Sequence, residues 1–559
     1  MTVASENLPL QRLWHWERAR ADQPYLTQPM GGGQSRDYSW SQAVGEARRM
    51  AAYLQAQGYA PGSRVAILSK NCAHWLMSDF AIWMAGYVSV PLYPTLTADS
   101  VRQILQHSEA VAVFVGKLDE WPQMKPGIPE GLHCISYPLS PPNDYPTWET
   151  IIAETKPLAG NPVRDGEELA TIIYTSGTTG MPKGVTMDFN AIGWAAEPME
   201  KAFGMTAEDR VLSYLPLSHV AERWTVEACS IRAGFRIYFA ESLDTFLRDL
   251  QNARPTMFIS VPRLWVKFQQ GIFSKIPKKK LDRLFSIPLL GKQLKKKILK
   301  QLGLDTVRFA GAGAAPLPVS VLEWYRDLGL ELLEGYGMSE NFGCSHGSLP
   351  GQARVGYVGN PWPGVECKLS DSGEVLVRSP ATTKGYFKEP EKTAEAFTED
   401  GFLRTGDLGE IDEQGRLKIT GRAKELFKTS KGKYVAPAPI ENKLGAHPQL
   451  EAVCVAGANQ NQPFALLMLA EDVAAKLAEG GEALREDITA SLQALLESVN
   501  AAVDPHERLA FMVVVKSQWT VENGFLTPTL KIKRNIVEST YEPQVDAWYA
   551  QRQPIIWEQ

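Results

Sequence analysis

The 559-residue sequence lacks the features that mark several large classes of protein. Its six cysteines are scattered and form no Cys-x-x-Cys pair, so neither a disulfide framework nor a zinc site is indicated, and a reducing cytoplasm is the expected compartment. The formal net charge is −5, which argues against a general nucleic-acid-binding protein because such proteins need a basic excess. The first residues contain no basic segment followed by an apolar run, so we expect no secretory signal.

Long apolar runs are also missing. The most apolar stretch, residues 75–94, is interrupted by Ser78 and Asp79 and is too broken to span a bilayer, so we expect a buried helix followed by a buried strand. What remains is an ordinary globular composition, with 44% apolar and 22% charged residues. The length exceeds what one hydrophobic core usually supports, so we expect a large domain of several sub-lobes and a smaller domain.

Apolar runs of strand length, each followed by a helical pattern, occur through the first two thirds of the sequence. They are residues 64–68, 111–115, 171–174, 257–261 and 307–310. Such alternation predicts parallel sheets covered by helices. Residues 356–420 read as short strands with turn signals, which predict a small antiparallel β lobe. We therefore predict an α/β fold in which residues 1–421 form a large N-terminal domain of stacked α/β sheets with that β lobe. Residues 422–559 then form a smaller α+β C-terminal domain.

A loop rich in glycine and hydroxyl groups follows the third of these predicted strands. It reads Tyr174-Thr-Ser-Gly-Thr-Thr-Gly-Met-Pro-Lys183-Gly-Val185. It offers free backbone N–H groups, close approach and one cation, which are the requirements for binding polyphosphate oxygens. It is not a Walker A motif, because glycine rather than serine or threonine follows Lys183. A second glycine cluster, residues 311–316, has proline where a dinucleotide fingerprint needs its third glycine. The loop predicts nucleotide phosphate binding, and a flexible surface loop is the alternative.

This segment resembles the signature loop of the adenylate-forming superfamily, which includes acyl-CoA synthetases, firefly luciferase and the adenylation domains of nonribosomal peptide synthetases. Further matches follow in the family's order from roughly residue 40 to residue 535. The resemblance implies that the C-terminal domain is mobile, that the loop binds ATP, and that Thr175 and Lys183 also act in catalysis. The ATP-binding loop residues are Thr175, Ser176, Gly177, Thr178, Thr179, Gly180 and Lys183.

A second motif, Glu334-Gly-Tyr-Gly-Met-Ser-Glu340, looks like the superfamily's Tyr-Gly-x-Thr-Glu element with serine in place of threonine. By this resemblance Tyr336 stacks on adenine, Ser339 approaches the α-phosphate and Glu340 holds Mg²⁺, a hard cation that prefers carboxylate oxygen. A plain turn would explain the glycines but not the acid. Together with the small residues that resemble the adenine border, the expected nucleotide contacts are Gly313, Ala314, Ala315, Glu334, Gly335, Tyr336, Gly337, Met338 and Ser339.

Two further motifs resemble the superfamily elements that hold the ribose and border the acyl pocket. In the segment Asp400-Gly-Phe-Leu-Arg-Thr-Gly-Asp407, the final aspartate is expected to accept hydrogen bonds from both ribose hydroxyls, and Arg422 is expected to contact ribose or phosphate. The aspartate alone could merely cap a turn. In the segment Leu215-Pro-Leu-Ser-His219, the histidine is expected beside the substrate carboxylate, with a catalytic role, although a lone histidine is usually structural.

The segment at residues 523–534 resembles the C-terminal lysine motif of long-chain acyl-CoA synthetases. Its lysine is expected to enter the main active site for adenylation. We favour Lys531 as this catalytic lysine, and the shortened spacing before it leaves Lys533 as the alternative. Without the resemblance, a basic run of this kind is usually a solvated surface.

The start of the C-terminal domain resembles the family's hinge and thiol entrance. Lys424 stands at the hinge position, and Lys428 and Lys433 are expected to bind the phosphates of CoA. The residues at 422–424 and 431–434 depart from the usual Arg-Lys-Lys and Gly-Gly-Lys-Asn of the long-chain branch. These departures bear on CoA affinity more than on adenylation.

Two features favour a long-chain acid as the substrate. Phrases such as Val261-Pro-Arg-Leu-Trp265 resemble the long-chain acyl-CoA synthetase branch rather than activators of acetate, coumarate or amino acids. The segment Lys275 to Lys300 has ten basic residues against the single acid Asp282, interleaved with apolar residues. Such a segment can rest on an anionic bilayer from which a fatty acid is drawn. The alternative is a solvated helical hairpin.

These patterns predict an enzyme that uses ATP and Mg²⁺ to convert a long-chain fatty acid to acyl-AMP and then transfers the acyl group to CoA. One alternative is an adenylate-forming enzyme with another acceptor, such as a carrier-protein thiol or a β-hydroxy group that closes a β-lactone. Another is a catalytically silent acyl or nucleotide sensor. We expect fatty acid and CoA as partners, no nucleic acid, and a cytoplasmic location with peripheral contact on the inner face of a membrane.

Overall fold

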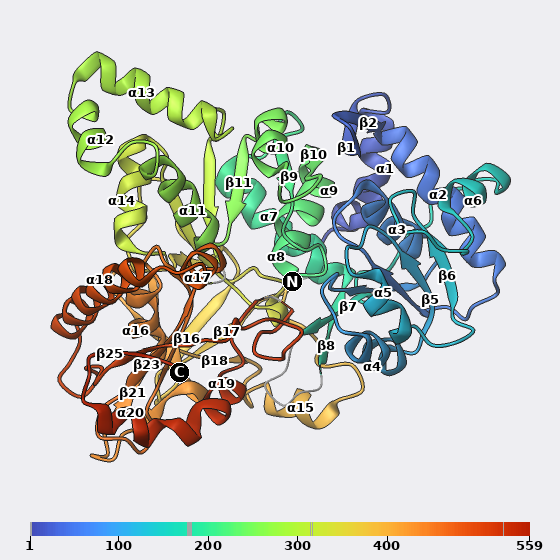
Figure 1. Cartoon of the computed structure of the whole chain (residues 1–559). Helices are drawn as coiled ribbons and strands as arrows, with labels where there is room; N and C mark the ends of the chain where they lie inside the picture. The colour runs from blue at the N-terminus through green and yellow to red at the C-terminus, as the bar shows by residue number, and fades with distance from the viewer. Residues whose placement is uncertain (1–2, 176–181, 314, 316, 529) are drawn as a thin grey trace. The chain divides into compact units, whose positions relative to one another are not determined.

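The computed structural model describes residues 3–175, 182–313, 315, 317–528 and 530–559. The chain divides into two compact units (Figure 1). The first unit is Met1–Ala315, Leu322–Cys367 and Leu376–Arg404, and the second is Pro316–Val321, Lys368–Val375 and Thr405–Gln559. The second unit thus takes in residues before 422, and the predicted domain boundary stays a prediction.

A six-stranded sheet in the first unit has the order β6-β5-β3-β4-β7-β8, and its first five strands run parallel. Along β3, Val65 and Ile67 belong to one hydrophobic core and Ala66 and Leu68 to another, so both faces of the sheet are buried. The strands are β3 (Arg64–Leu68), β4 (Val88–Leu92), β5 (Ala110–Val115), β6 (His133–Ser136), β7 (Leu169–Thr175) and β8 (Lys183–Asp188). The helices of this region are α2 (Trp40–Ala56), α3 (Ala73–Met84), α4 (Ala98–Ser108), α5 (Trp121–Met124), α6 (Trp148–Glu154) and α7 (Phe189–Phe203). The buried helix and strand expected over residues 75–94 are α3 and β4.

The strand predicted at residues 171–174 is followed by a second strand, so the prediction of a helical segment directly after it is wrong. β8 pairs antiparallel with β7. Val185 and Met187 are buried whereas Thr186 is partly exposed, which is the two-residue period of a strand. Helix α7 begins only at Phe189, where the Asp188 side chain accepts a hydrogen bond from a backbone N–H of the first turn.

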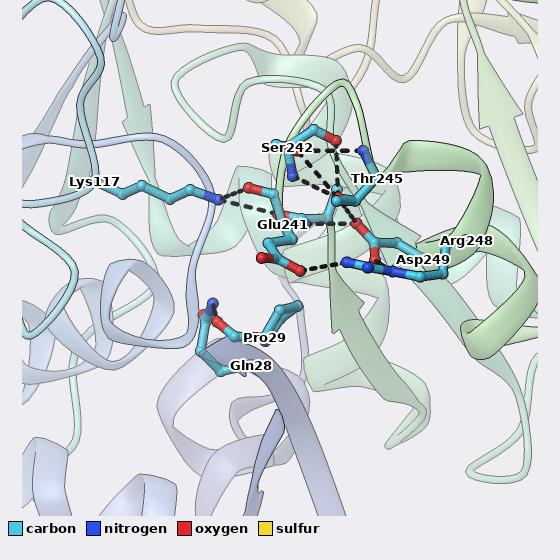
Figure 2. Close-up of polar contacts among 9 residues, drawn as sticks. Gln28, Pro29, Lys117, Glu241, Ser242, Thr245, Arg248 and Asp249 are labelled. Carbon is cyan, nitrogen blue, oxygen red and sulfur yellow. Dashed lines mark hydrogen bonds and ion pairs between the residues drawn. The ribbon is translucent and has the colours of Figure 1, made fainter. Parts of the chain in front are cut away.

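A second sheet of the first unit has the order β2-β1-β10-β9. Its strands are β1 (Pro24–Gly31), β2 (Gln34–Ser39), β9 (Arg210–Ser213) and β10 (Arg236–Phe239). Lys117, just after β5, donates hydrogen bonds to the carbonyls of Ala240 and Glu241, just after β10 (Figure 2). Asp249 closes the same loop by accepting the Glu241 N–H at 2.8 Å. A single lysine therefore ties the carboxyl ends of two strands from different sheets.

The third sheet of the first unit has the order β11-β12-β13-β14-β15. Its first three strands are parallel, and the last two are added antiparallel. They are β11 (Met257–Ser260), β12 (Phe309–Ala312), β13 (Leu332–Tyr336), β14 (His346–Gly347) and β15 (Asn360–Pro361). Helices α11 (Pro262–Phe273), α12 (Lys278–Phe285) and α13 (Pro288–Gln301) connect β11 to β12, and α14 (Val319–Leu328) follows β12. The carboxyl ends of the parallel strands share one edge, which is where α/β sheets commonly bind ligands.

A buried charge cluster lies at the π-helical turn Arg223–Ala228. Arg223 is fully buried and forms ion pairs with Asp79 of α3 and, at 2.8 Å, with Glu227. Burial raises the pKa of both carboxyls. Arg223 opposes this rise because its charge favours the ionised carboxylates, so the cluster sets one cation against two acids inside the core. Further helices of this unit are α1 (Pro9–Ala19), α8 (Val220–Glu222), α9 (Cys229–Ala233), α10 (Phe246–Ala253) and α15 (Pro390–Glu395).

The second unit has α+β architecture, with a main sheet in the order β22-β23-β24-β25. Ile488 and Leu492 of α18 pack on one face of this sheet, and Val537 of α19 and Trp548 of α20 pack on the other. The strands are β22 (Leu450–Ala456), β23 (Phe464–Leu469), β24 (Met512–Val514) and β25 (Ile555–Trp557), and the helices are α16 (Pro437–Leu444), α17 (Glu471–Ala478), α18 (Glu482–Ala501), α19 (Arg534–Tyr541) and α20 (Val545–Gln551).

Shorter strands precede this sheet in sequence, and the boundaries between the two units fall within three of them. The strands are β16 (Glu366–Leu369), β17 (Glu374–Arg378), β18 (Leu403–Ile411), β19 (Leu417–Arg422), β20 (Phe427–Lys428) and β21 (Tyr434–Val435). β18 pairs antiparallel with β19, and β20 pairs antiparallel with β21. Among the described residues, no helix is both long and apolar enough to cross a membrane.

Candidate active site

The lysine of the phosphate loop stands at the start of a strand. Lys183 is the first residue of β8, and it pairs with Thr175, the last residue of β7. The hairpin therefore places these two predicted catalytic residues opposite each other, where the loop leaves and re-enters the sheet. The loop residues predicted to bind phosphate, Ser176, Gly177, Thr178, Thr179 and Gly180, lie outside the described residues.

Tyr386 lies against this hairpin, and the sequence analysis missed it. Its main chain forms an antiparallel bridge with Val185, and the N–H of Phe387 donates to the carbonyl of Gly184 at 2.8 Å. The ring centroid of Tyr386 lies 4.9 Å from Nζ of Lys183, which is a cation–π distance. Tyrosine is not a group that marks a phosphate or metal site in sequence, so only the fold reveals this neighbour.

Glu340 reaches the same tyrosine from the 3-10 turn Ser339–Asn341, which follows β13. The hydroxyl of Tyr386 donates to Oε1 of Glu340 at 2.8 Å, and the N–H of Thr383 donates to the carbonyl of Glu340 at 2.7 Å. Burial, followed by the Glu340 carboxylate, raises the pKa of Tyr386, so the hydroxyl stays protonated and keeps donating. Tyr386 therefore brings together a lysine and a glutamate that are far apart in sequence.

This arrangement fits a magnesium ion that is bound with a nucleotide. The described residues contain no group of three or more His, Cys, Asp or Glu side chains placed to form an all-protein metal site. Mg²⁺ in nucleotide sites is usually held by one or two carboxylates together with substrate phosphates. Glu340 offers a carboxylate whose orientation is fixed by Tyr386, close to a lysine suited to phosphate.

The predicted adenine contacts lie at the end of β13. Tyr336 pairs with His346 of β14, and their ring centroids are 6.0 Å apart. Burial lowers the pKa of His346 to about 4, so a neutral imidazole faces the tyrosine at neutral pH. A Cβ atom on Gly337 would lie 1.9 Å from the carbonyl oxygen of Gly343, so the chain can take this path only with glycine at position 337.

The neighbouring members of this motif are fixed by main-chain hydrogen bonds. The buried Glu334 accepts the N–H of Ser348 at its carbonyl, at 2.9 Å. The N–H of Met338 donates to Oδ1 of Asn341 at 2.9 Å, and Ser339 begins the 3-10 turn Ser339–Asn341. The segment between β13 and Glu340 is thus held in one conformation.

Gly313 and Ala315 follow β12, the strand next to β13. The N–H of Gly313 donates to the carbonyl of Ser260 at 3.3 Å, and a Cβ atom on Gly313 would lie 3.6 Å from the carbonyl oxygen of Gly335. The structure therefore brings Gly313 beside the adenine motif. Ala315 is exposed, and Ala314 lies outside the described residues.

His219 is the N-cap residue of α8. Its Nδ1 accepts the N–H of Ala221 at 3.1 Å, and its ring centroid lies 6.5 Å from that of Tyr93. The imidazole is partly exposed. This capping bond fixes the orientation of the ring and settles that Nδ1 is an acceptor.

Glu222, three residues beyond His219, is a buried acid to which the sequence analysis gave no role. Its Oε1 accepts hydrogen bonds from the Ser213 hydroxyl at 2.7 Å and from the Tyr214 N–H at 3.0 Å. Burial raises the pKa of Glu222 to about 8. It borders a cavity of about 20 Å³ whose other walls are Met205, Val211, Leu212, Thr225, Val226, Met257, Ile259 and Phe309.

In the second unit, the two predicted ribose residues contact each other. Asp407 of β18 pairs with Arg422 of β19, and Nε of Arg422 donates to Oδ1 of Asp407 at 2.8 Å. Asp407 is buried and its N–H donates to Thr405, whereas half of the Arg422 side chain is exposed. The arginine therefore orients the buried carboxylate.

The predicted lysines of the second unit stand on turns. Lys428 and Lys433 are exposed and flank the tight turn between β20 and β21. Lys531 is exposed, and its N–H and carbonyl both bond to Thr527. Lys533, the alternative, is less exposed and is the N-cap residue of α19. Lys424 lies in the short 3-10 turn Ala423–Glu425.

Comparison with known families gives the class of protein. Residues 13–387 match the AMP-binding enzyme family, and residues 425–553 match the AMP-binding enzyme C-terminal domain. The chain therefore belongs to the AMP-binding enzyme family, and the predicted resemblance to adenylate-forming enzymes is confirmed.

The chain is also similar to individual proteins over nearly its whole length. It is 31% identical to the long-chain-fatty-acid–CoA ligase FadD15 of Mycobacterium bovis, over 96% of each chain. It is 30% identical to the peroxisomal long chain acyl-CoA synthetase 7 of Arabidopsis thaliana, over 96% of this chain and 85% of the relative.

Solved structures share the fold. The A domain of a carboxylic acid reductase from Segniliparus rugosus, in complex with AMP and a co-purified carboxylic acid, superposes with a TM-score of 0.79 at 23% identity, over 98% of this chain and 94% of that chain. The anthranilate CoA ligase AuaEII, in complex with anthranoyl-AMP, gives a TM-score of 0.78 at 20% identity, over 96% of this chain and 98% of that chain. The predicted α/β fold is confirmed.

Proposed function

We propose that this protein activates a long-chain fatty acid with ATP and joins it to CoA, giving acyl-CoA, AMP and pyrophosphate. The observation that carries the proposal is the convergence of Lys183 and Glu340 on Tyr386, because a polyphosphate and its magnesium require a cation and a carboxylate in one place. The choice of acid and acceptor follows the relatives named long-chain-fatty-acid–CoA ligase and long chain acyl-CoA synthetase.

In the first half-reaction, the acid carboxylate attacks the α-phosphorus of ATP and pyrophosphate leaves. Both partners are negative, so charge neutralisation and in-line positioning are the first requirements. Lys183 binds phosphate oxygens, and Glu340 holds Mg²⁺, which neutralises phosphate charge when bound. Lys531 bridges the carboxylate and the α-phosphate, with Lys533 as the alternative. An ion pair at about 4 Å is worth about 4 kcal/mol at an effective dielectric near 20, which is enough to change the rate by orders of magnitude.

The nucleotide is held by contacts that do not take part in bond breaking. Tyr336 stacks on adenine, and Gly313 and Gly337 allow the backbone to approach the base closely. Asp407 accepts the ribose hydroxyls in the orientation that Arg422 imposes. These contacts position the α-phosphorus for attack. Positioning of the reacting atoms supplies much of the rate gain in phosphoryl and adenylyl transfer.

In the second half-reaction, the CoA thiol attacks the acyl carbonyl and AMP leaves. Lys428 and Lys433 are exposed and bind the phosphates of CoA. The C-terminal domain turns about Lys424 to exchange the adenylation contacts for the thioester contacts.

The cavity beside Glu222 is the inner end of the acyl site. Seven of its nine wall residues are apolar, which suits an acyl chain. Its volume of about 20 Å³ accommodates little more than one water-sized sphere, so side chains must move apart before a long chain enters.

An exchange assay tests the proposal. Purified protein with Mg²⁺ is expected to catalyse fatty-acid-dependent ATP–pyrophosphate exchange, with a rate that rises along a series of fatty acids of increasing length. Added CoA is expected to convert the adenylate to thioester. Exchange without thioester would point to another acceptor, and no exchange with any fatty, aryl or hydroxy acid would refute the proposal.

The same proposal includes peripheral contact of Lys275 to Lys300 with the cytoplasmic face of a membrane. A long-chain acid is concentrated in lipid rather than in water, so contact with a bilayer would bring the enzyme to its substrate.

A further inference from the structure

The connection between β11 and β12 is much longer than its topology requires. Adjacent parallel strands can be joined by one helix, and α11 alone has 12 residues. Helices α12 and α13 are additional, and in Figure 1 they extend from this sheet as a hairpin of two helices. Among their residues only Leu281, Gly291 and Ile298 are buried, so the hairpin contributes little to the hydrophobic core.

The turn between the two helices exposes a group of large apolar side chains. Ile287 is 45% exposed, Leu289 is 81% exposed and Leu290 is 46% exposed. Single exposed apolar residues are ordinary, but a contiguous group indicates a binding surface. The rigid Pro288 lies within this group at the first turn of α13.

The flanks of this apolar turn are strongly basic. Of the ten basic side chains between Lys275 and Lys300, two form ion pairs within the described part of the chain, Lys278 with Asp282 and Lys295 with Asp327. The other eight are exposed, and they are Lys275, Lys279, Lys280, Arg283, Lys292, Lys296, Lys297 and Lys300.

The placement of these charges works against the hairpin itself. Helix α12 begins with Lys278, Lys279 and Lys280, although the positive end of the helix dipole disfavours cations in the first turn. Helix α13 places Lys292, Lys296 and Lys300 four residues apart along one face, where like charges destabilise a helix. A solvated hairpin would gain nothing from this arrangement, whereas an external anionic surface would relieve it.

We propose that this hairpin docks the protein on an anionic phospholipid bilayer. Ile287, Leu289 and Leu290 enter the boundary between headgroups and acyl chains, and the eight exposed basic side chains lie over the anionic headgroups. The apolar turn favours a bilayer over a nucleic acid, because a phosphate backbone has no use for three exposed aliphatic side chains. The inference deepens the membrane contact of the proposed function, but lipid binding can be measured without any substrate.

Flotation of the full chain with vesicles tests this inference. The protein is expected to float with vesicles that contain phosphatidylglycerol, at least about tenfold better than with phosphatidylcholine alone. Leu289→Ser is expected to weaken flotation about tenfold, since about one leucine side chain is withdrawn from the lipid. The matched control is Leu243→Ser, at a residue that is 92% exposed and lies outside the hairpin. It is expected to float like the parent.

Two double variants test the contribution of the exposed basic side chains. Lys296→Glu with Lys297→Glu is expected to reduce flotation by roughly tenfold or more, whereas Lys125→Glu with Lys156→Glu, at exposed positions elsewhere, is expected to have a much smaller effect. Equal flotation with and without anionic lipid would overturn the inference. So would loss on charge reversal without loss in Leu289→Ser, which would indicate a generic polyanion site.

Exchange activity in the absence of vesicles separates this inference from the proposed function. All hairpin variants are expected to keep normal exchange with a short, water-soluble acid. A parent protein that floats on anionic vesicles but exchanges with no acid would refute the proposed function and leave the docking surface standing. Normal exchange without selective flotation would refute the docking surface and leave the proposed function standing.

Discussion

The predicted site residues of the two units are held in different ways. In the first unit, Lys183 and Glu340 both contact Tyr386, Lys183 is paired with Thr175 in a hairpin, and the carbonyl of Glu340 accepts the N–H of Thr383. In the second unit, Lys433 and Lys531 are exposed on turns, and Lys428 is exposed at the end of the two-residue strand β20. Groups that must be preorganised for phosphate chemistry thus stand on a strand or on a turn shortly after one. Groups expected to serve only one half-reaction are carried on the surface of the other unit.

The Asp407 and Arg422 pair qualifies this comparison. It belongs to the second unit and is nevertheless preorganised, because both residues lie on paired strands. A ribose contact is needed in both half-reactions, so the distinction follows the task of a residue rather than its unit.

Lys531→Ala is expected to slow adenylate formation by roughly 10²- to 10³-fold, as is typical for the loss of one preorganised donor. Thioester formation from preformed acyl-AMP should be retained, because this lysine is expected to act only in adenylate formation. ATP–pyrophosphate exchange and a thioester assay measure the two steps. Lys533→Ala is the matched control. Normal exchange in Lys531→Ala combined with a loss in Lys533→Ala would transfer the role to Lys533.

Lys424→Pro is expected to reduce thioester formation by about 10²-fold, the scale of a misplaced reacting group, and to spare adenylation. The proline ring fixes φ and so restricts the hinge. Lys424→Ala keeps the backbone free and should behave like the parent in both assays. If Lys424→Pro lost both half-reactions together, misfolding would be the better explanation, and circular dichroism would reveal it.

Tyr386→Phe is expected to slow exchange about tenfold, since a hydrogen bond to a charged group is worth about 1.5–3 kcal/mol. The ring remains beside Lys183, so the main effect should be a higher Mg²⁺ concentration for half-maximal exchange, with little change in the KM for the acid. Tyr53→Phe removes a hydroxyl that contacts His133 instead and serves as the control. An unchanged Mg²⁺ requirement in Tyr386→Phe would show that the tyrosine does not orient Glu340.

Glu222→Gln is expected to have the smallest effect, on stability. The pKa of Glu222 in the folded chain is about 8, above its ordinary value of 4.5. As pH rises, the unfolded chain therefore releases this proton before the folded chain does. The parent consequently loses stability as pH rises between about 4.5 and about 8. The glutamine variant lacks this dependence. Its melting temperature should therefore exceed that of the parent by a few degrees at most, and only toward pH 8. The exposed Glu130→Gln is the control, and a gain largest at low pH would contradict the assignment.

The sequence predicted the fold class and several strands closely. The run at residues 64–68 coincides with β3, because a continuous apolar stretch bounded by turn residues has few other solutions. The run at 307–310 begins and ends two residues earlier than β12 (Phe309–Ala312), which is an ordinary error in an element boundary. Antiparallel β8 was missed, since the alternation of Val185 and Met187 is too short to outweigh the expectation of a helix.

The site was predictable only where chemistry is carried by local motifs. Lys183, Glu340, Asp407 and Arg422 stand in recognisable segments, and their individual roles stay predictions. Tyr386 could not be found, because its importance comes from contacts with Lys183 and Glu340 across three separate segments. The raised pKa of Glu222 arises from burial, which no single residue pattern reports.

The buried carboxyl of Glu222 changes how the charge of this protein should be counted. The formal value of −5 treats every acid as ionised, whereas Glu222, with a pKa of about 8, keeps its proton in most folded molecules at neutral pH. Unfolding at neutral pH therefore ejects protons into the buffer. The calorimetric heat of unfolding will consequently depend on the ionisation enthalpy of the buffer chosen, and native gels will show a less acidic protein than its composition suggests.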